Sequence, residues 1–224
     1  MKKAAYAVFI GGAALLVFAS YRQYLAISLT EVFGFITGVV CVWLVVKQNI
    51  WNWPVGIANE LFFIIVFWRA RLFADMSLQF LYVILALLGW YRWLYGGQGK
   101  TALHVSRITA KAAIVLSAIC ATSTAGLARY LRSVHDAAPF WDALTTVLSV
   151  IAQYLQTKKV VESWHVWITV DVFYIGLYLY KSLALTALLY LIFLIMCIIG
   201  VREWQASLAN DARAAALEPQ PLAE

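Results

Sequence analysis

The sequence predicts an all-α protein that crosses a membrane several times. Composition is the first observation, because 64% of the 224 residues are hydrophobic, 12% are charged, and the mean hydropathy is +0.81. Soluble domains carry about 25% charged residues. A series of long apolar runs is the second observation, since a helix that spans a bilayer needs roughly 20 mostly apolar residues. Together they indicate a polytopic helical membrane protein.

An internal repeat at a constant offset of 111 residues is the third observation. Matched Leu pairs would carry little weight, but acids, Trp and Gly also recur over the same stretch. A duplicated bundle with polar groups at matching depths is how many carriers build a central substrate site. The informative pairs are Glu31/Asp142, Lys47/Lys158, Trp53/Trp164, Glu60/Asp171, Phe63/Tyr174, Phe67/Tyr178, Gly89/Gly200 and Trp93/Trp204.

Apolar runs predict eight spans, at about 4–20, 25–46, 50–68, 72–94, 110–128, 138–156, 160–180 and 182–202. The first run also resembles a secretory signal peptide, whose removal would leave seven helices; we favour a retained helix. The second to fourth spans match the sixth to eighth, a step of four positions along the chain, so the two repeats run the same way through the membrane. The expected units are an N-terminal helix (1–23), a first repeat (24–95), a loop and linker helix (96–136), a second repeat (137–204) and a frayed cytoplasmic tail (205–224).

The basic residues predict the orientation through the positive-inside rule. With the N-terminus inside, eleven fall on the cytoplasmic side and six on the other, which favours cytoplasmic termini. The same rule accounts for the net charge of +6 without a nucleic-acid partner. The inside set is Lys2, Lys3, Lys47, Arg92, Lys100, Arg107, Lys111, Lys158, Lys159, Arg202 and Arg213; the outside set is Arg22, Arg69, Arg71, Arg129, Arg132 and Lys181.

One face of the predicted helix 160–180 combines aromatic side chains with a carboxylate. At 100° per residue, Trp164, Trp167, Asp171, Tyr174 and Tyr178 fall within an arc of about 80°. The matching face of helix 50–68 carries a second acid, and two Asn side chains lie beside it. Its residues are Trp53, Gly56, Glu60, Phe63 and Phe67, with Asn52 and Asn59 on the adjoining face.

These two acids are the strongest functional signal. A carboxylate at the bilayer centre costs about 2.5–3.5 kcal/mol on insertion scales, so it should face the bundle interior or a cavity. Asp171 and Glu60 could simply bond to neighbouring helices, but their symmetric placement among aromatics favours a binding role. Aromatic planes around an acid suit a flat, positively charged ring, held by stacking and cation–π attraction.

Other residues in the spans have simpler interpretations. The Trp residues near helix ends, Trp90, Trp93, Trp141 and Trp204, are expected to be interfacial anchors. For Gln79 and Gln153 we favour contacts between helices over hydrogen bonds to a hydroxylated ligand. The three Cys are expected to pack, with neither disulfide nor metal. Motifs of metalloproteases, P-loop enzymes and serine hydrolases are missing, so we expect neither an enzyme nor a cofactor.

The pattern Trp164-x-x-Trp167-x-x-x-Asp171-x-x-x-x-x-x-Tyr178 resembles the WxxWxxx(N/D)xxxxxxY signature of the Pnu vitamin transporters. The segments 52–59 (NWPVGIAN) and 139–142 (PFWD) are also similar, and the resemblance extends from about Glu31 to Trp204. It implies a SWEET-like 3+1+3 helix core with an extra N-terminal helix, assembled as a homotrimer. It also implies a substrate site at Trp164, Trp167, Asp171 and Tyr178, with Asn59 from the first half.

The resemblance further implies uptake of a vitamin across the inner membrane by facilitated diffusion, made one-way by cytoplasmic phosphorylation. Nicotinamide riboside is the expected substrate and thiamine the runner-up, because both contain a cationic aromatic ring. A second hypothesis is a proton-coupled carrier that uses Asp171 or Glu60. A membrane enzyme or structural subunit is disfavoured, since there is no nucleophile or metal set and the acids are buried.

Overall fold

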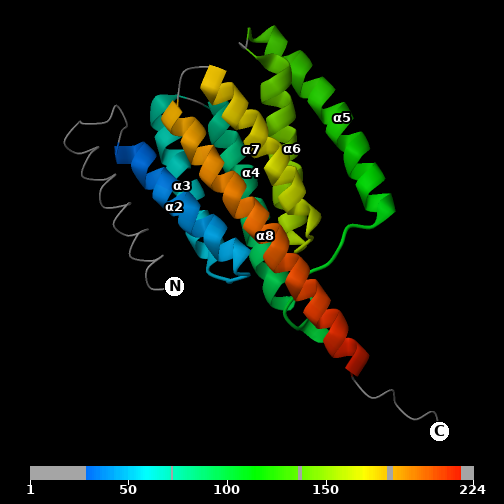
Figure 1. Cartoon of the computed structure of the whole chain (residues 1–224). Coiled ribbons are helices and arrows are strands. Elements are labelled where there is room, and N and C mark those ends of the chain that lie inside the picture. Colours follow the sequence, from blue (N-terminus) through cyan, green and yellow to red (C-terminus); the bar gives the residue numbers. More distant parts are fainter. Residues whose placement is uncertain (1–28, 72, 136–137, 181–183, 218–224) are drawn as a thin grey trace.

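The computed structural model describes residues 29–71, 73–135, 138–180 and 184–217, and these form an all-helical bundle (Figure 1). The all-α prediction is therefore confirmed for this part, while the expected span 4–20 lies outside it. A short 3₁₀ turn, η1 (Gln98–Lys100), interrupts the longest connection. The helices are α2 (Leu29–Val46), α3 (Asn52–Ala70), α4 (Phe73–Tyr95), α5 (Ala110–Ser133), α6 (Pro139–Thr157), α7 (Glu162–Tyr180) and α8 (Ala184–Leu217).

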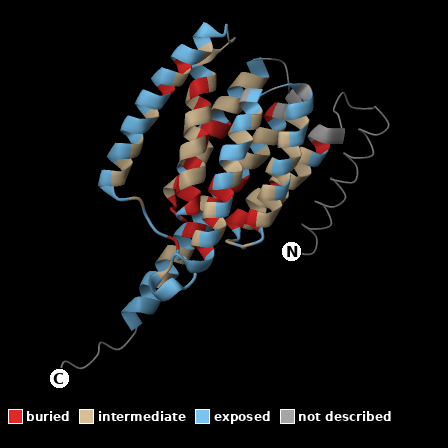
Figure 2. Cartoon of the chain, turned by 180° about the vertical axis from the view of Figure 1, so that it is seen from behind, coloured by how far each residue is buried: buried red, intermediate tan, exposed pale blue. Residues whose placement is uncertain are grey.

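Six of the helices pack in a closed sequence of neighbours. Helix α3 packs between α2 and α4, and α7 packs between α6 and α8. Contacts of α4 with α6 and of α2 with α8 join the two groups, so each helix of the ring touches two others. Helix α5 lies outside the ring against α6 (Figure 1). Buried residues gather within the ring, whereas most of α5 is exposed (Figure 2).

Three stretches of the described chain are long and apolar enough to cross a membrane by length and composition alone, namely Asp75–Tyr95, Ala110–Ser133 and Ala187–Leu217. Helices α3 and α7 are as long as a span but contain polar residues, including Glu60 and Asp171. A polar residue in such a helix is stable when it faces protein rather than lipid. Helices α3 and α7 can therefore hold these two acids where they face the other helices of the bundle.

Helix α8 continues well past the predicted end of its span, so the expectation of a frayed tail was wrong as far as Leu217, and residues 218–224 lie outside the described part of the chain. The helix extends without interruption to Leu217. Its last part is rich in Ala, the residue with the highest helix propensity. Asp211 on this extension also pairs with His104 of the α4–α5 connection at 3.0 Å. Propensity and this contact together explain the continued helix.

The two repeats use the same pairing of a Trp with a Gly. Trp53 of α3 packs against Gly89 of α4, where an added Cβ would lie 2.2 Å from the indole. Trp164 of α7 packs against Gly200 of α8, where the corresponding distance is 2.6 Å. All four residues correspond at the 111-residue offset. Only a residue without a side chain permits this close approach, so the glycines set how closely α4 and α8 lie against α3 and α7.

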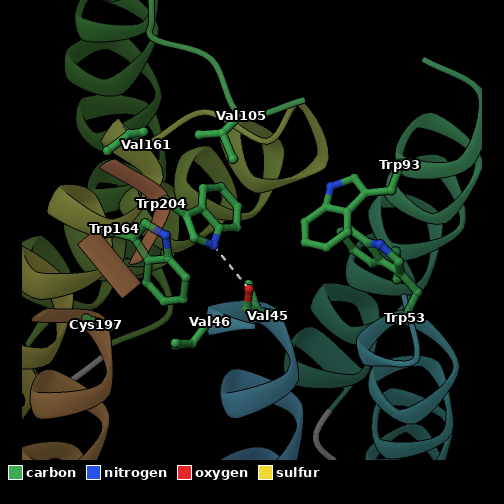
Figure 3. Close-up of a cluster of buried hydrophobic side chains, with 10 residues drawn as sticks. Val45, Val46, Trp53, Trp93, Val105, Val161, Trp164, Cys197 and Trp204 are labelled. Atoms are coloured by element: carbon green, nitrogen blue, oxygen red, sulfur yellow. Dashed lines mark hydrogen bonds between the residues drawn. The ribbon is translucent and has the colours of Figure 1, made fainter. Parts of the chain in front are cut away.

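Two further Trp residues connect the halves reciprocally, and Figure 3 shows one of the two hydrogen bonds, from Trp204 to Val45. The indole N–H of Trp93 donates to the Gln156 carbonyl at 3.0 Å, and that of Trp204 donates to the Val45 carbonyl at 3.2 Å. Val45 and Gln156 again correspond at the 111-residue offset. The two hydrogen bonds are therefore equivalent: each half donates one to the other, as expected for two repeats related by a pseudo-twofold axis. Trp93 and Trp204 are 3% and 0% exposed. Their expected role as anchors at the membrane surface was therefore wrong, because both side chains are buried in the contact between the two repeats.

Backbone and side-chain hydrogen bonds join the α4–α5 connection to the α6–α7 connection. Ser106 and Val160 form a parallel bridge between the α4–α5 and α6–α7 connections. The Lys159 ammonium donates to the Leu103 carbonyl at 2.8 Å and lies 4.7 Å from the centre of the Trp93 ring. Burial lowers the pKa of Lys159, while the charge of Asp211 acts in the opposite direction. These contacts hold the short connections over the Trp cluster.

Candidate functional site

Asp171 lies at the middle of α7 and is 4% exposed. Its carboxylate accepts a hydrogen bond from the Cys197 thiol of α8, at 3.4 Å from Sγ to Oδ2. No Lys, Arg or His side chain pairs with it among the residues that the structure describes. A thiol is a weak donor. The charge of Asp171 therefore has no cationic partner within the described protein.

Glu60 occupies the equivalent place at the middle of α3 and is half-buried. Within the described ranges its carboxylate makes neither a hydrogen bond nor an ion pair. The Cys41 thiol of α2 lies close enough to interact with it electrostatically. Placing an unpaired acid in a membrane span costs free energy, and such acids usually lie on an ion or substrate pathway or bind a ligand. Two such acids at matched depths define the candidate site.

Aromatic side chains surround the Asp171 side of the site. The Trp167 indole N–H donates to Gln156 Oε1 of α6 at 2.8 Å, which fixes the plane of the ring. The rings of Tyr174 and Tyr178 stack at 5.9 Å between centroids. Tyr190 of α8 contacts both of them, at 4.7 and 5.3 Å. The predicted stripe on α7 therefore faces α6 and α8, as a binding face within the ring requires.

Phenol groups connect the two acids. Tyr82 of α4 hydrogen-bonds to Ser149 of α6 and interacts electrostatically with both Glu60 and Tyr174. Tyr174 in turn interacts electrostatically with Asp171. Glu60 therefore lies within electrostatic range of Tyr82, and Asp171 within that of Tyr174. The candidate site therefore draws on α3, α4, α6, α7 and α8.

Tyr82 and Tyr190 were not predicted from the sequence. Both are common residues in apolar helices, and neither belongs to the α3 or α7 stripe. A signal was available, because Tyr82 lies on the same face of α4 as the repeated Gly89 and Trp93. Helical spacing from those two landmarks would have identified it.

Three predicted site residues lie in close packing. Trp53 and Trp164 are 2% and 1% exposed against their glycines, and Asn52 donates to the Asn49 carbonyl at 2.7 Å. In the described part, the buried indole N–H groups of both Trp residues lack an acceptor. Asn59 is half-buried, and its amide donates to the Thr37 hydroxyl of α2. Trp53, Trp164 and Asn52 are therefore packed against protein, and their part in ligand binding stays a prediction, whereas Asn59 lies beside Glu60.

A cavity of about 750 Å³ lies elsewhere, between α5 and α6. Its lining includes Ala121, Thr124 and Ala128 together with two basic residues, Arg129 and Arg132. None of the predicted site residues borders it. The described residues that line it include no acid and one aromatic ring, that of Phe140, so they differ from the stripes of α3 and α7.

Within the described chain, a ring of apolar helices holds two acids without cationic partners among aromatic side chains, which is the architecture of a membrane carrier for a small molecule. The sequence profile of the nicotinamide mononucleotide transporter family matches residues 28–206, and the chain belongs to this family. Its relatives are named as transporters, which is not an enzymatic role.

Individual relatives agree with this assignment. The nicotinamide riboside transporter PnuC of Escherichia coli is 26% identical over 213 residues, covering 84% of this chain and 87% of its own. The riboflavin/roseoflavin transporter RibM of Streptomyces davaonensis is 25% identical over 190 residues, covering 82% and 88%. A crystal structure of the vitamin B3 transporter PnuC superimposes with a TM-score of 0.69 at 22% identity, covering 91% and 89% of the two chains. That likeness shows a shared fold.

Proposed function

We propose that this protein carries nicotinamide riboside across the bacterial inner membrane by facilitated diffusion. The observation that supports the proposal best is the pair of mid-span acids, Asp171 and Glu60, which lack cationic partners in the described protein. A cationic ligand would supply the missing charge. The nicotinamide ring of the riboside is flat and positively charged, so it matches both the acids and the aromatic faces beside them.

Each group in the site then has a defined task. Asp171 balances the ring charge, and Trp167, held by Gln156, offers a face for stacking. Tyr174 and Tyr178 close the aromatic wall, while Glu60 and Asn59 contribute from the first repeat. A desolvated site strengthens the attraction between the acid and the cation. Uptake becomes one-way when the riboside is phosphorylated in the cytoplasm, and the product enters NAD biosynthesis.

The wider assembly belongs to the same proposal. We expect a SWEET-like 3+1+3 core with one additional N-terminal helix, cytoplasmic termini and a homotrimer in the lipid bilayer. The proposed units remain 1–23, 24–95, 96–136, 137–204 and 205–224. The count of basic residues supports the orientation.

Thiamine is the second candidate substrate, because it also has a cationic aromatic ring. Riboflavin is a third, given the relative named for it, although its ring is neutral and would leave Asp171 without a cation. A thermal-shift screen of the purified protein against these vitamins separates the three. A ligand at a hundred times its Kd stabilises the folded state by about 2.7 kcal/mol. We expect nicotinamide riboside to raise the Tm most; a larger shift with another vitamin would contradict the substrate assignment.

Proton coupling is the alternative mechanism, and the observation that favours it is the Glu60 carboxylate, which has no ion-pair partner among the described residues. Carboxylates without partners often carry protons in membrane proteins. Under facilitated diffusion, uptake into vesicles should continue when the proton gradient is abolished. Uptake that stops on addition of a protonophore would instead assign Glu60 or Asp171 to proton transfer.

Replacing Trp167 by Ala should weaken binding of nicotinamide riboside about thirtyfold. A stacked, desolvated aromatic contributes up to about 2 kcal/mol to the binding of a cation. Calorimetry on the purified variant measures the change. Trp68→Ala is the matched control, because it removes a Trp that is 64% exposed at the far end of α3. Equal affinities in the two variants would remove Trp167 from the binding site.

A further inference from the structure

The cavity of about 750 Å³ between α5 and α6 lies outside the six-helix ring and has small side chains along its α5 wall. Its size is within the range of small-molecule sites, about 300–1,000 Å³. Phe140 and Leu144 of α6 border it on the other side. The small residues of α5 are exposed or border exposed positions, so the cavity is open along its length. They recur at the spacing of one helix face and are Ser117, Ala121, Thr124, Ala125 and Ala128.

Thr124 contributes to this wall a buried hydroxyl that the described chain does not pair. The residue is 5% exposed, and its Oγ1 has no hydrogen-bond partner among the described residues. A Thr within a helix usually donates to the carbonyl four residues earlier. Thr122 does so to Ala118 at 2.9 Å, and Thr145 does so to Trp141 at 2.9 Å. Since buried polar groups are nearly always paired, the Thr124 hydroxyl needs a partner from a molecule in the cavity.

Two arginines give one end of the cavity a positive charge. Arg129 and Arg132 line it near the C-terminal end of α5, and both are exposed. Neither forms an ion pair with any residue that the structure describes, and the described lining contains no acid. A guanidinium presents its N–H donors in a planar fork that fits a phosphate group. This end of the cavity therefore has the charge and the donors that a phosphate requires.

The length of the cavity matches one leaflet of a bilayer. Ser117 and Arg129 both line it and are twelve positions apart on α5, which corresponds to about 18 Å along the helix axis. Half of a bilayer's hydrocarbon core is about 15 Å thick. Since α5 is long and apolar enough to cross a membrane, the cavity extends from the charged end to about the middle of the bilayer. That is the depth of one acyl chain.

We propose that the cavity between α5 and α6 is a binding site for an anionic phospholipid. Arg129 and Arg132 bind the phosphate of the headgroup, and one acyl chain lies along the small residues of α5. The glycerol esters follow the phosphate by a few bonds, so the Thr124 hydroxyl donates to an ester carbonyl. Free phosphate would leave the apolar part empty, and an apolar face of a second copy would leave the arginines without an anion. The cavity shares no residue with the substrate site, so this inference is independent of the transported molecule.

Titration of the purified full chain with phosphatidylglycerol in a neutral detergent, followed through the Tm, measures the affinity for the lipid. The wild type should be stabilised by phosphatidylglycerol far more than by phosphatidylcholine or inorganic phosphate. Arg129→Gln combined with Arg132→Gln should weaken binding about thirtyfold, because each basic residue near the membrane surface contributes roughly fivefold. The matched control is Arg69→Gln combined with Arg71→Gln, which removes the same charge from exposed positions on the same expected side of the membrane. It should leave the affinity unchanged.

Two variants test the cavity without changing its charge. Ala125→Phe fills it from an exposed position, so binding of phosphatidylglycerol should be lost while the Tm without lipid is kept. Thr124→Val keeps the shape and removes the unpaired hydroxyl, so the affinity should fall about fivefold and the Tm without lipid should stay the same or rise.

Three results would overturn the inference. Equal stabilisation by phosphatidylcholine or by inorganic phosphate would remove the anionic lipid, and unchanged affinity in Ala125→Phe would remove the cavity. Native mass spectrometry supplies the third measurement, because it reports bound lipid and the number of copies in the assembly together. If Ala125→Phe changes the number of copies instead of the bound lipid, the cavity is a contact between subunits.

Discussion

Replacing Asp171 by Asn should lower the affinity for nicotinamide riboside about 30- to 150-fold. The substitution keeps size and hydrogen-bonding capacity but removes the charge that balances the cationic ring. Loss of one partner of a buried charge pair costs about 2–5 kcal/mol, and the remaining amide places the effect near the lower end of that range. Calorimetry with the riboside and with a neutral isostere of the same ring and sugar measures the charge contribution separately.

The neutral isostere decides what the loss means. It should bind Asp171→Asn about as well as it binds the wild type. If both ligands lose affinity equally, damaged packing at the Cys197 contact explains the loss. Glu60→Gln is the matched comparison, because it removes the equivalent charge in α3, and we expect a smaller reduction there. Asp171 has the stronger claim, since Trp167, Tyr174 and Tyr178 surround it, whereas α3 offers Gly56 in place of Trp167.

Replacing Gly89 or Gly200 by Ala should destabilise the bundle by about 1–3 kcal/mol each, the usual cost of overpacking a core. The new Cβ would lie 2.2 Å from the Trp53 ring or 2.6 Å from the Trp164 ring, so a helix must move. For a chain of this size, the Tm should fall by about 2–4 °C per kcal/mol.

The control is Gly126→Ala in α5, where an added Cβ meets nothing within 4 Å. It should leave the Tm unchanged or raise it, because Ala has the higher helix propensity. Unfolding of each variant can be followed by its fluorescence in detergent. A Gly89→Ala protein as stable as Gly126→Ala would show that the contact between Trp53 and Gly89 does not limit the spacing of α3 and α4.

The fold was largely predictable because its main constraint is local. Apolar runs long enough for a bilayer fold as helices wherever backbone groups must be satisfied internally. The 111-residue repeat then predicted pairs that the structure places in equivalent contacts, such as Trp53 with Gly89 and Trp164 with Gly200. Trp93 and Trp204 were misassigned because a Trp near a helix end fits an interface and a buried core equally well. Only the pairing of the two halves distinguishes these roles.

The site was predictable where one helix carries it. Helical periodicity places Trp167, Asp171, Tyr174 and Tyr178 on one face, and the structure turns that face toward α6 and α8. Periodicity within one helix does not reveal what the facing helices contribute, which is why Tyr82 and Tyr190 were missed. The contacts between helices expected of Gln79 were wrong for the same reason, because its side-chain oxygen has no hydrogen-bond partner in the described chain. Periodicity also placed Trp164 on the same face as Asp171. In the structure, Trp164 lies near the start of α7, where it packs against Gly200 and Trp204.

Uptake of labelled nicotinamide riboside into liposomes that contain the purified protein tests the central claim most directly. The account predicts saturable uptake that equilibrates across the membrane, continues in the presence of a protonophore, and is strongly reduced in Asp171→Asn. Uptake that requires a proton gradient would contradict facilitated diffusion. A wild-type protein that transports no riboside, or an Asp171→Asn protein that transports it normally, would contradict the proposed substrate and its binding site.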